Sequence, residues 1–232
     1  MRIAFVSAGM TSESSGTVTV MKELSEALRT NGNEVWIYTV DAGRGYFRFP
    51  VTDPNRCFSP PGIWAQKLCV SRALPRLLRE HMADLDIVHN HSLWMWACHN
   101  SAQVARQQGQ PYVVTPHGTL DKWTLAHSRW KKQLAAALFQ DHDLRGAACL
   151  HALTSEEADH IRAYGLTNPI AIVPNGISLA PFATEHMPDA LFQSFPQLRD
   201  KKLRLYLSRL HFKKGLDRLI PAWSHVIDRA HD

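Results

Sequence analysis

Short, continuous apolar runs recur along the chain, and each predicts a buried β-strand. Such runs are typical of strands that are covered on both faces, as in a parallel sheet. They lie at residues 3–6, 34–39, 86–89, 112–115, 150–153 and 170–173. Between the runs, apolar residues recur every three or four positions, which predicts amphipathic helices. These helices are expected at residues 18–28, 63–81, 95–108, 127–140 and 155–164.

The alternation of strands and helices predicts the fold class. We expect an α/β protein with a Rossmann-like, doubly wound parallel sheet and helices on both faces. Residues 3–39 read as strand, glycine loop, helix and strand, which is a βαβ unit with the usual right-handed crossover. Residues 41–61 are rich in Gly, Pro and aromatic residues, so an irregular segment or a short hairpin is expected there. Pro75 is expected to kink or split its helix, because it lacks a backbone N–H.

The same pattern predicts two domains of unequal size. A Rossmann-like domain is expected over residues 1–176, followed by a linker rich in Pro and polar residues over 177–201. Residues 202–232 then begin a second alternation, with one strand and one helix. A typical domain has roughly 100–200 residues, and one strand with one helix cannot bury a core of its own. The second Rossmann-like domain is therefore expected to be truncated.

Composition and charge narrow the class of protein. Hydrophobic residues make up 45% of the 232 residues and charged residues 20%, as in ordinary globular proteins. The net charge of +5 suits nucleic acid, anionic lipid or a phosphorylated ligand, but there is no dense Lys/Arg block, so no nucleic-acid partner is expected. The four cysteines form no C-x-x-C pattern, and the polar N-terminus does not fit a signal peptide. We expect a cytoplasmic protein, with the inner face of the membrane as the alternative location.

Two loops that follow strands carry candidate binding residues. In an open parallel sheet, ligands gather at the carboxyl ends of the strands. Gly16 lies at the expected start of a helix, where its backbone would let a diphosphate approach; it could equally serve loop geometry alone. His117 lies between Pro116 and Gly118 at a strand end. Its imidazole would donate a hydrogen bond or hold a sugar hydroxyl, and the alternative is a bond within its own turn.

A second group of candidates follows the strand at residues 86–89. His89 and His91 would share a face of the strand, and an H-x-H pair can bind metal. Apart from His99, no further ligand has supporting spacing, so no metal site is expected. We expect His91 to line the cleft and His89 to have a structural role. Trp94 either packs in the core or contacts a sugar or lipid acceptor.

The predicted helix at residues 127–140 has two distinct faces. Trp130, Leu134 and Leu138 share one face, and Lys131 and Lys132 lie away from the leucines. A solvated basic face is the simpler interpretation, and contact with lipid headgroups is the alternative.

Near the C-terminus, a basic turn joins an apolar run to a helix. The apolar run covers residues 203–207, and helical spacing resumes at 216–220. Arg209 and Lys214 flank the turn and together could neutralise a diphosphate. The alternative is a solvated turn with no ligand.

Taken together, these motifs resemble those of the retaining glycosyltransferases of family 4, which have the GT-B fold. The stretches that carry the resemblance are Ser15–Thr17, Asp86–Trp94, Pro116–Leu120, Leu153–Glu157, Val173–Ile177 and Leu207–Leu216. No single stretch is specific, but the ordered set covers nearly the whole chain. The resemblance implies two Rossmann-like domains that face each other across a cleft. The N-terminal domain would mainly hold the acceptor, and the C-terminal domain a nucleotide sugar.

The resemblance also implies roles for individual residues. Gly16 would face the donor diphosphate, and His117 would lie at the sugar and the reacting centre. Arg209 and Lys214 would grip the diphosphate and stabilise the charge that develops as the nucleotide leaves. The family uses front-face attack with neither a protein nucleophile nor an essential metal, so no cofactor is expected beyond the nucleotide-sugar substrate.

Two departures from the family pattern bear on activity. The first loop has Ser15-Gly16 where the family often has paired glycines, and the family's pair of C-domain glutamates has no counterpart. The expected reaction is hexose transfer to a polysaccharide or lipid-linked saccharide, as in polysaccharide or lipopolysaccharide synthesis, with peripheral membrane contact allowed. We expect this chain to be inactive alone. The alternatives are a non-catalytic module that binds an acceptor or partner, and the non-functional product of an interrupted gene.

Overall fold

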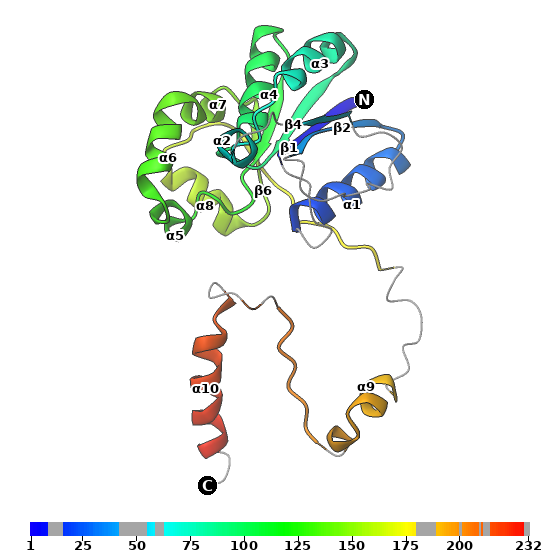
Figure 1. The fold of residues 1–232 in the computed structure, drawn as a ribbon, viewed down its shortest axis with the longest axis vertical. Helices are drawn as coiled ribbons and strands as arrows, with labels where there is room; N and C mark the ends of the chain where they lie inside the picture. The colour runs from blue at the N-terminus through cyan, green and yellow to red at the C-terminus, as the bar shows by residue number, and fades with distance from the viewer. Residues whose placement is uncertain are drawn as a thin grey trace. The chain divides into compact units, whose positions relative to one another are not determined.

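A computed structural model describes most of the chain in two compact units. The described residues are 1–8, 16–41, 55–58, 63–179, 189–199, 201–208, 210 and 214–229. The first unit is Met1–Ser178 and the second is Leu179–Asp232 (Figure 1). None of the helices formed by the described residues combines the length and apolar character needed to cross a bilayer.

The first unit is built on a parallel sheet. Its strands are β1 (Arg2–Ala8), β2 (Glu34–Asp41), β3 (Asn55–Phe58), β4 (Ile87–His91), β5 (Tyr112–Thr115), β6 (Cys149–Ala152) and β7 (Ile170–Ile172). Within the described part of the chain the sheet has seven strands in the order β3-β2-β1-β4-β5-β6-β7, and every neighbouring pair is parallel. The predicted Rossmann-like α/β fold class is confirmed.

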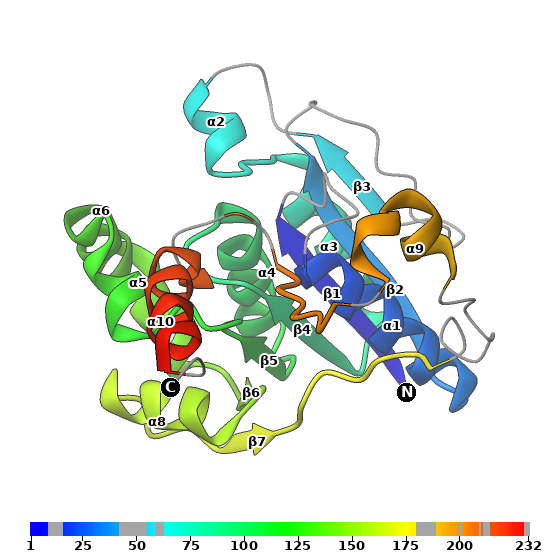
Figure 2. The ribbon, with the colours of Figure 1, turned by 90° about the horizontal axis from the view of Figure 1, so that it is seen from below.

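Helices cover both faces of this sheet. They are α1 (Gly16–Thr30), α2 (Ile63–Lys67), α3 (Ala73–His81), α4 (Trp96–Gln107), α5 (Lys122–Ala126), α6 (Arg129–Ala135), α7 (Asp141–Arg145) and α8 (Ser155–Ala163). A π-helical turn, Ala136–Gln140, joins α6 to α7. Figure 1 shows α1 on one side of the sheet and α3 and α4 on the other, and Figure 2 gives the view at right angles.

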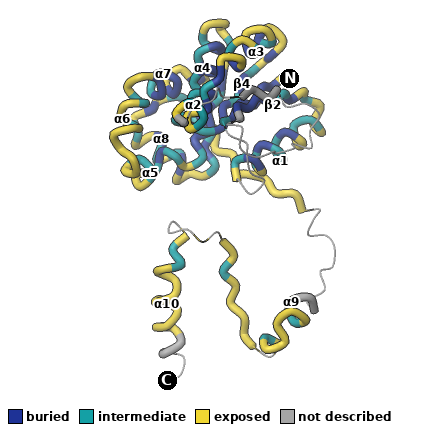
Figure 3. The backbone as a smooth tube through the Cα atoms, viewed as in Figure 1, coloured by how far each residue is buried: buried dark blue, intermediate teal, exposed yellow. Residues whose placement is uncertain are grey.

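The alternation of side chains along β1 explains its unbroken apolar sequence. Ala4 and Val6 belong to the large core cluster that includes residues of α3 and α4, whereas Ile3 and Phe5 pack with residues of α1. Ala4, Phe5 and Val6 are completely buried. Figure 3 shows buried backbone, in dark blue, at the centre of the first unit. Both faces of β1 therefore bury apolar surface in the protein interior, which favours a central position for this strand in the sheet.

Two segments of the first unit differ from the sequence-based prediction. Residues 55–58 pair in parallel with β2, so the expected hairpin is wrong there; residues 42–54 and 59–62 lie outside the described part. The expected helix over 63–81 does split, but at residues 68–72, before Pro75. Pro75 is the third residue of α3, where a missing N–H removes no intrahelical bond.

The second unit contains two helices, α9 (Asp189–Ser194) and α10 (Leu216–Arg229). The helix expected after residue 216 is present. The strand expected from residue 202 is not formed. Residues 202–207 are extended but pair with no other strand among the described residues. Leu205 and Leu207 are 86% and 88% exposed. A strand needs a neighbouring backbone to pair with its N–H and C=O groups, and no described segment supplies one.

Close packing at the end of α7 gives a test of the fold. A methyl group at Gly146 would lie 2.6 Å from the Tyr112 hydroxyl oxygen. That hydroxyl donates to the Asp143 carbonyl and accepts from Arg106. We expect Gly146→Ala to lower the free energy of unfolding by about 2 kcal/mol through overpacking.

Urea denaturation measures this change, and Gly176→Ala is the matched control. A methyl group at Gly176 meets no atom within 4 Å. The control is expected to stay within about 0.5 kcal/mol of the wild type. Equal stabilities of the two variants would contradict the predicted clash.

Candidate functional site

Four histidine side chains gather toward the carboxyl ends of three neighbouring strands. His89 and His91 come from β4, His117 follows β5, and His151 lies in β6. The ring centroids of His89 and His91 are 4.1 Å apart, and those of His91 and His117 are 5.5 Å apart. Because parallel strands end at one edge of the sheet, residues distant in sequence meet there.

A chain of hydrogen bonds fixes the protons of one part of the cluster. His151 Nε2 lies 2.8 Å from the Val173 carbonyl oxygen, which can only accept, so this nitrogen carries the proton. In neutral His151 the Nδ1 atom then accepts from the Thr115 hydroxyl, at 2.8 Å. The Thr115 oxygen in turn accepts from His89 Nε2, at 2.7 Å. His89 is thus held in one orientation and one tautomer.

His91 and His117 form a separate pair. His91 is completely buried, and its Nδ1 atom lies 3.2 Å from His117 Nε2. Burial lowers the pKa of His91 well below its usual range, and the neighbouring histidines add to this effect. Burial also lowers the pKa of His117 to about 4, although Glu157 acts in the opposite direction. Both rings are therefore neutral near pH 7, and one of them donates to the other.

The turn that carries His117 is held in a strained conformation. His117 has φ +53° and Gly118 has φ +70°, and the left-handed region costs a non-glycine residue roughly 1–2 kcal/mol. The buried Glu157 carboxylate stabilises this turn by accepting from Gly118 N at 2.6 Å and from Leu153 N at 2.7 Å. Thr154 caps α8 by accepting from Glu157 N. The glutamate thus ties α8 to the His117 turn.

Strain also marks the loop after β4. Ser92 has φ +112° and Trp94 has φ +67°. The Trp94 backbone N–H donates to Gln140 Oε1 at 2.6 Å, which anchors the loop to the π-helical turn. Strained backbone of this kind persists where the surrounding structure holds it, and it gathers at functional sites.

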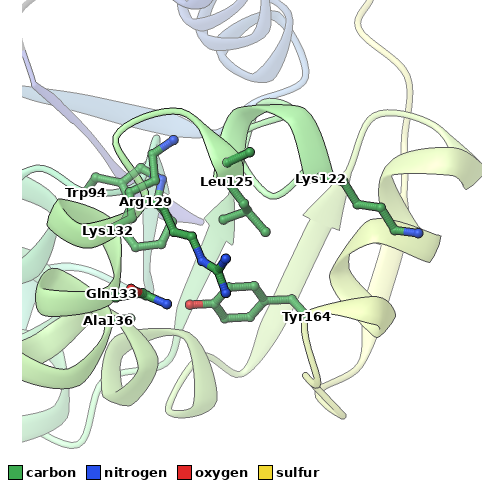
Figure 4. Close-up of a pocket in the computed structure, with 9 residues that line it drawn as sticks. Trp94, Lys122, Leu125, Arg129, Lys132, Gln133, Ala136 and Tyr164 are labelled. Atoms are coloured by element: carbon green, nitrogen blue, oxygen red, sulfur yellow. The ribbon is translucent and has the colours of Figure 1, made fainter.

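A pocket lies beside this loop. Its volume is about 410 Å³, and it is lined by Trp94, Lys122, Leu125, Ala126, Arg129, Lys132, Gln133, Ala136 and Tyr164 (Figure 4). The buried indole N–H of Trp94 has no hydrogen-bond partner among the described residues. The sequence predicts that Trp94 either packs in the core or contacts a sugar or lipid acceptor. In the structure its side chain lines this pocket.

Of the other predicted site residues, all but Arg209 lie within the described part of the chain. Gly16 begins α1, and no atom lies within 4 Å of a methyl group placed on it. Lys214 is exposed in the second unit, where its carbonyl accepts from the Tyr206 hydroxyl. Arg209 lies outside the described residues. His91 is buried rather than lining an open cleft, because its ring packs against Phe5 and His117. No His, Cys, Asp or Glu cluster suited to a metal ion occurs in the described parts of the chain.

The strand order and the helices on both faces place the protein in the Rossmann-like α/β class. The model of the family described as Glycosyltransferase Family 4 matches residues 14–180. The chain belongs to this family, which confirms the resemblance seen in the sequence motifs. No curated protein matches the chain in sequence.

Solved structures with the same fold include a protein solved with UDP and glucose, a galactosyltransferase and an epimerase. Anabaena HepE, solved with UDP and glucose, has 14% identity and a TM-score of 0.57 over 85% of this chain and 50% of its own. The lipopolysaccharide outer core galactosyltransferase WaaB has 18% identity and a TM-score of 0.54 over 77% and 47%. The UDP-GlcNAc 2-epimerase of Methanocaldococcus jannaschii has 14% identity and a TM-score of 0.54 over 75% and 46%. The chain thus spans about half the length of these proteins.

The buried histidines predict a dependence of stability on pH. Burial lowers the pKa of His89 to about 3 and that of His117 to about 4, from 6.5. As the pH falls below 6.5, the unfolded chain binds protons that the folded state does not, so stability decreases down to about pH 4. Each such histidine contributes a loss of about 2 kcal/mol at pH 5.

Urea denaturation at pH 7 and pH 5 checks this dependence. His91→Phe removes one of these groups, so its loss of stability between the two pH values should be smaller than that of the wild type by about 2 kcal/mol. His142→Phe, at an exposed position of α7, should lose as much as the wild type. A loss in His91→Phe equal to that of the wild type would refute the predicted linkage.

Proposed function

We propose that the chain forms the acceptor side of an enzyme that transfers a hexose from a nucleotide sugar to a saccharide. Its membership in glycosyltransferase family 4 carries the proposal. The acceptor is a polysaccharide or a lipid-linked saccharide, and the anomeric configuration is retained. WaaB, a lipopolysaccharide galactosyltransferase with the same fold, supports a role in cell-surface saccharide synthesis.

His117 is the proposed catalytic residue. Its Nε2 atom is engaged by His91, whereas Nδ1 has no hydrogen-bond partner among the described residues. The ring is neutral near pH 7 because burial lowers its pKa to about 4. Nδ1 can therefore form one hydrogen bond with a sugar hydroxyl at the reacting centre, and the neutral ring brings no charge to that site. His91 holds the ring in place and does not touch the substrate.

Other residues stabilise the negative charge on the departing nucleotide. Gly16 opens the 15-residue helix α1, whose free N–H groups suit the donor diphosphate. Arg209 and Lys214 neutralise the same diphosphate. The bond from the anomeric carbon to the phosphate oxygen breaks as the acceptor oxygen attacks from the same face. The acceptor's proton passes to the departing phosphate, and the positive charges stabilise that group.

We place this activity in the cytoplasm, at the inner face of the membrane for a lipid-linked acceptor. Cys98 and Cys149 are free thiols, which fits a reducing compartment.

Transfer of radiolabelled glucose from UDP-glucose to a mixture of saccharide and lipid-linked acceptors tests the proposed function. UDP-glucose is chosen because HepE was also solved in complex with it. We expect little or no incorporation by this chain alone. In the complete enzyme whose acceptor side it forms, we expect incorporation, and a decrease of roughly 100-fold or more in His117→Ala, since a positioned catalytic group contributes about that factor. His142→Ala, on α7, should retain wild-type activity.

The remaining outcomes separate the alternatives. Acceptor binding in calorimetry without incorporation would favour the non-catalytic binding module. Absence of both acceptor binding and incorporation would reject the proposed function. Equal activity of His117→Ala and His142→Ala would remove His117 from the catalytic role.

A further inference from the structure

Glu157 accepts hydrogen bonds from two segments that lie outside its own helix. It is the third residue of α8, and only 6% of it is exposed. Its Oε1 atom accepts from Gly118 N, in the turn after β5, and its Oε2 atom accepts from Leu153 N, directly after β6. One buried side chain thus joins α8 to the segments that follow two neighbouring strands.

These bonds differ from those of an ordinary capping box. In a capping box, the glutamate at the third helical position accepts from the backbone N–H of the N-cap residue. The N-cap residue of α8 is Thr154, and its hydroxyl accepts from Glu157 N in the usual way. The carboxylate, however, reaches past Thr154 to Leu153 and across to Gly118. Helix capping alone therefore does not account for the position of this carboxylate.

The turn that contains His117 has a backbone conformation that disfavours histidine. Its two central residues, His117 and Gly118, have φ values of +53° and +70°, and Thr119 N donates to the Pro116 carbonyl at 3.3 Å. Turns with positive φ at both central positions favour Gly, Asn and Asp. The Thr119 hydroxyl adds a bond to the Pro116 carbonyl, at 2.8 Å. The bond from Gly118 N to Glu157 is the contact that ties this turn to another helix.

The position of the His117 ring depends on this backbone. The ring lies at 24° to that of His91, with 5.5 Å between the centroids, and its Nε2 atom is 3.2 Å from His91 Nδ1. Because φ at His117 sets the direction of its Cα–Cβ bond, a return to negative φ would move the imidazole away from His91. His91 therefore holds the ring, and Glu157 holds the backbone that carries the ring.

The carboxylate also acts on the imidazole through its charge. Burial lowers the pKa of His117, and Glu157 acts in the opposite direction. Both carboxylate oxygens already accept from backbone N–H groups, and the side chain is buried. Direct contact with a saccharide would cost one of these bonds, so any effect of Glu157 on a bound sugar passes through His117.

We propose that Glu157 is a positioning residue for His117, and that its bonds to Gly118 and Leu153 hold the turn that presents the imidazole to a bound saccharide. This inference rests on the proposed function, in which His117 contacts the sugar at the reacting centre. It adds a residue from α8 to a site otherwise built from β4 and β5.

Hydrogen exchange and ring-nitrogen NMR spectra of the 232-residue chain test this role without any sugar. Glu157→Gln replaces one carboxylate oxygen by an NH2 group, which cannot accept from a backbone N–H. At least one of the Gly118 and Leu153 amides should then exchange about tenfold faster, since a hydrogen bond to a charged group is lost. The ring-nitrogen signals of His117 should shift, whereas those of His99, which is bonded to Asp143, should stay in place.

The matched control is Glu156→Gln, which removes the same charge from the same first turn of α8 at an exposed position. It should change the exchange of Gly118 less than twofold and leave the His117 signals in place. The Ala158 amide, which donates to the Thr154 carbonyl, reports whether α8 stays formed and should exchange equally in both variants. Equal effects of the two variants on Gly118 and His117 would overturn the proposal, as would faster exchange of Ala158 together with Gly118.

The wild type provides a measurement that does not depend on the folding of a variant. Gly118 is itself exposed, so its amide should owe its protection to Glu157 and exchange at least about tenfold more slowly than the amide of an unstructured glycine. Exchange at the unstructured rate would overturn the proposal.

A kinetic measurement on the complete enzyme separates this inference from the proposed function. Glu157→Gln should lower kcat roughly tenfold with little change in KM for the nucleotide sugar, because the ring remains but is less well placed. Glu156→Gln should match the wild type, and equal kcat values of the two variants would overturn the positioning role. A wild type that transfers no sugar would reject the proposed function, whereas the NMR contrast between the variants would still support the role of Glu157 in holding His117.

Discussion

The parallel pairing of β4 with β5 and of β5 with β6 is the constraint on which the candidate site depends. Its register sets His91 beside Thr115 and places His89 and His151 within reach of the Thr115 hydroxyl. Since all three strands point the same way, the loops after β4 and β5 open at one edge. A slip of one residue in β4 would turn both of its histidines to the opposite face of the sheet.

The interior next to this edge is polar, unlike the rest of the core, and its polar groups are largely paired. Asn90, on the opposite face of β4 from His91, is held by Ser101 and by the Cys98 carbonyl. Thr115 joins two histidines, and Glu157 secures the strained turn after β5. Such a network rigidifies its surroundings when its members are satisfied. The exceptions include His91 Nε2 and the Trp94 indole N–H, at the edge where strained residues gather.

Much of the fold followed from local pattern, and the exceptions share a cause. β1 was predictable because a strand buried on both faces has a continuous apolar run. α10 was predictable because its apolar residues recur at helical spacing. The expected strand at 202–207 had the right composition but lacks a neighbouring backbone. Nothing nearby in sequence reveals that the Glu157 carboxylate reaches Gly118, 39 residues away. The spacing of apolar residues predicts which face of a helix is apolar, but not whether another element covers that face. The exposure of Trp130 therefore could not be predicted from the sequence.

The sequence by itself determined the Rossmann-like class and the family, and it predicted a turn at His117. Those features depend on periodicity and on residue types at fixed local spacing, such as a glycine after a histidine at a strand end. Only the tertiary structure decided that His91 is a buried partner of His117 rather than a cleft residue, and that Trp94 and Arg129 line one pocket. The reason is physical: burial, hydrogen-bond pairing and cavity shape arise from contacts between segments whose separation in sequence carries no information about their distance in space.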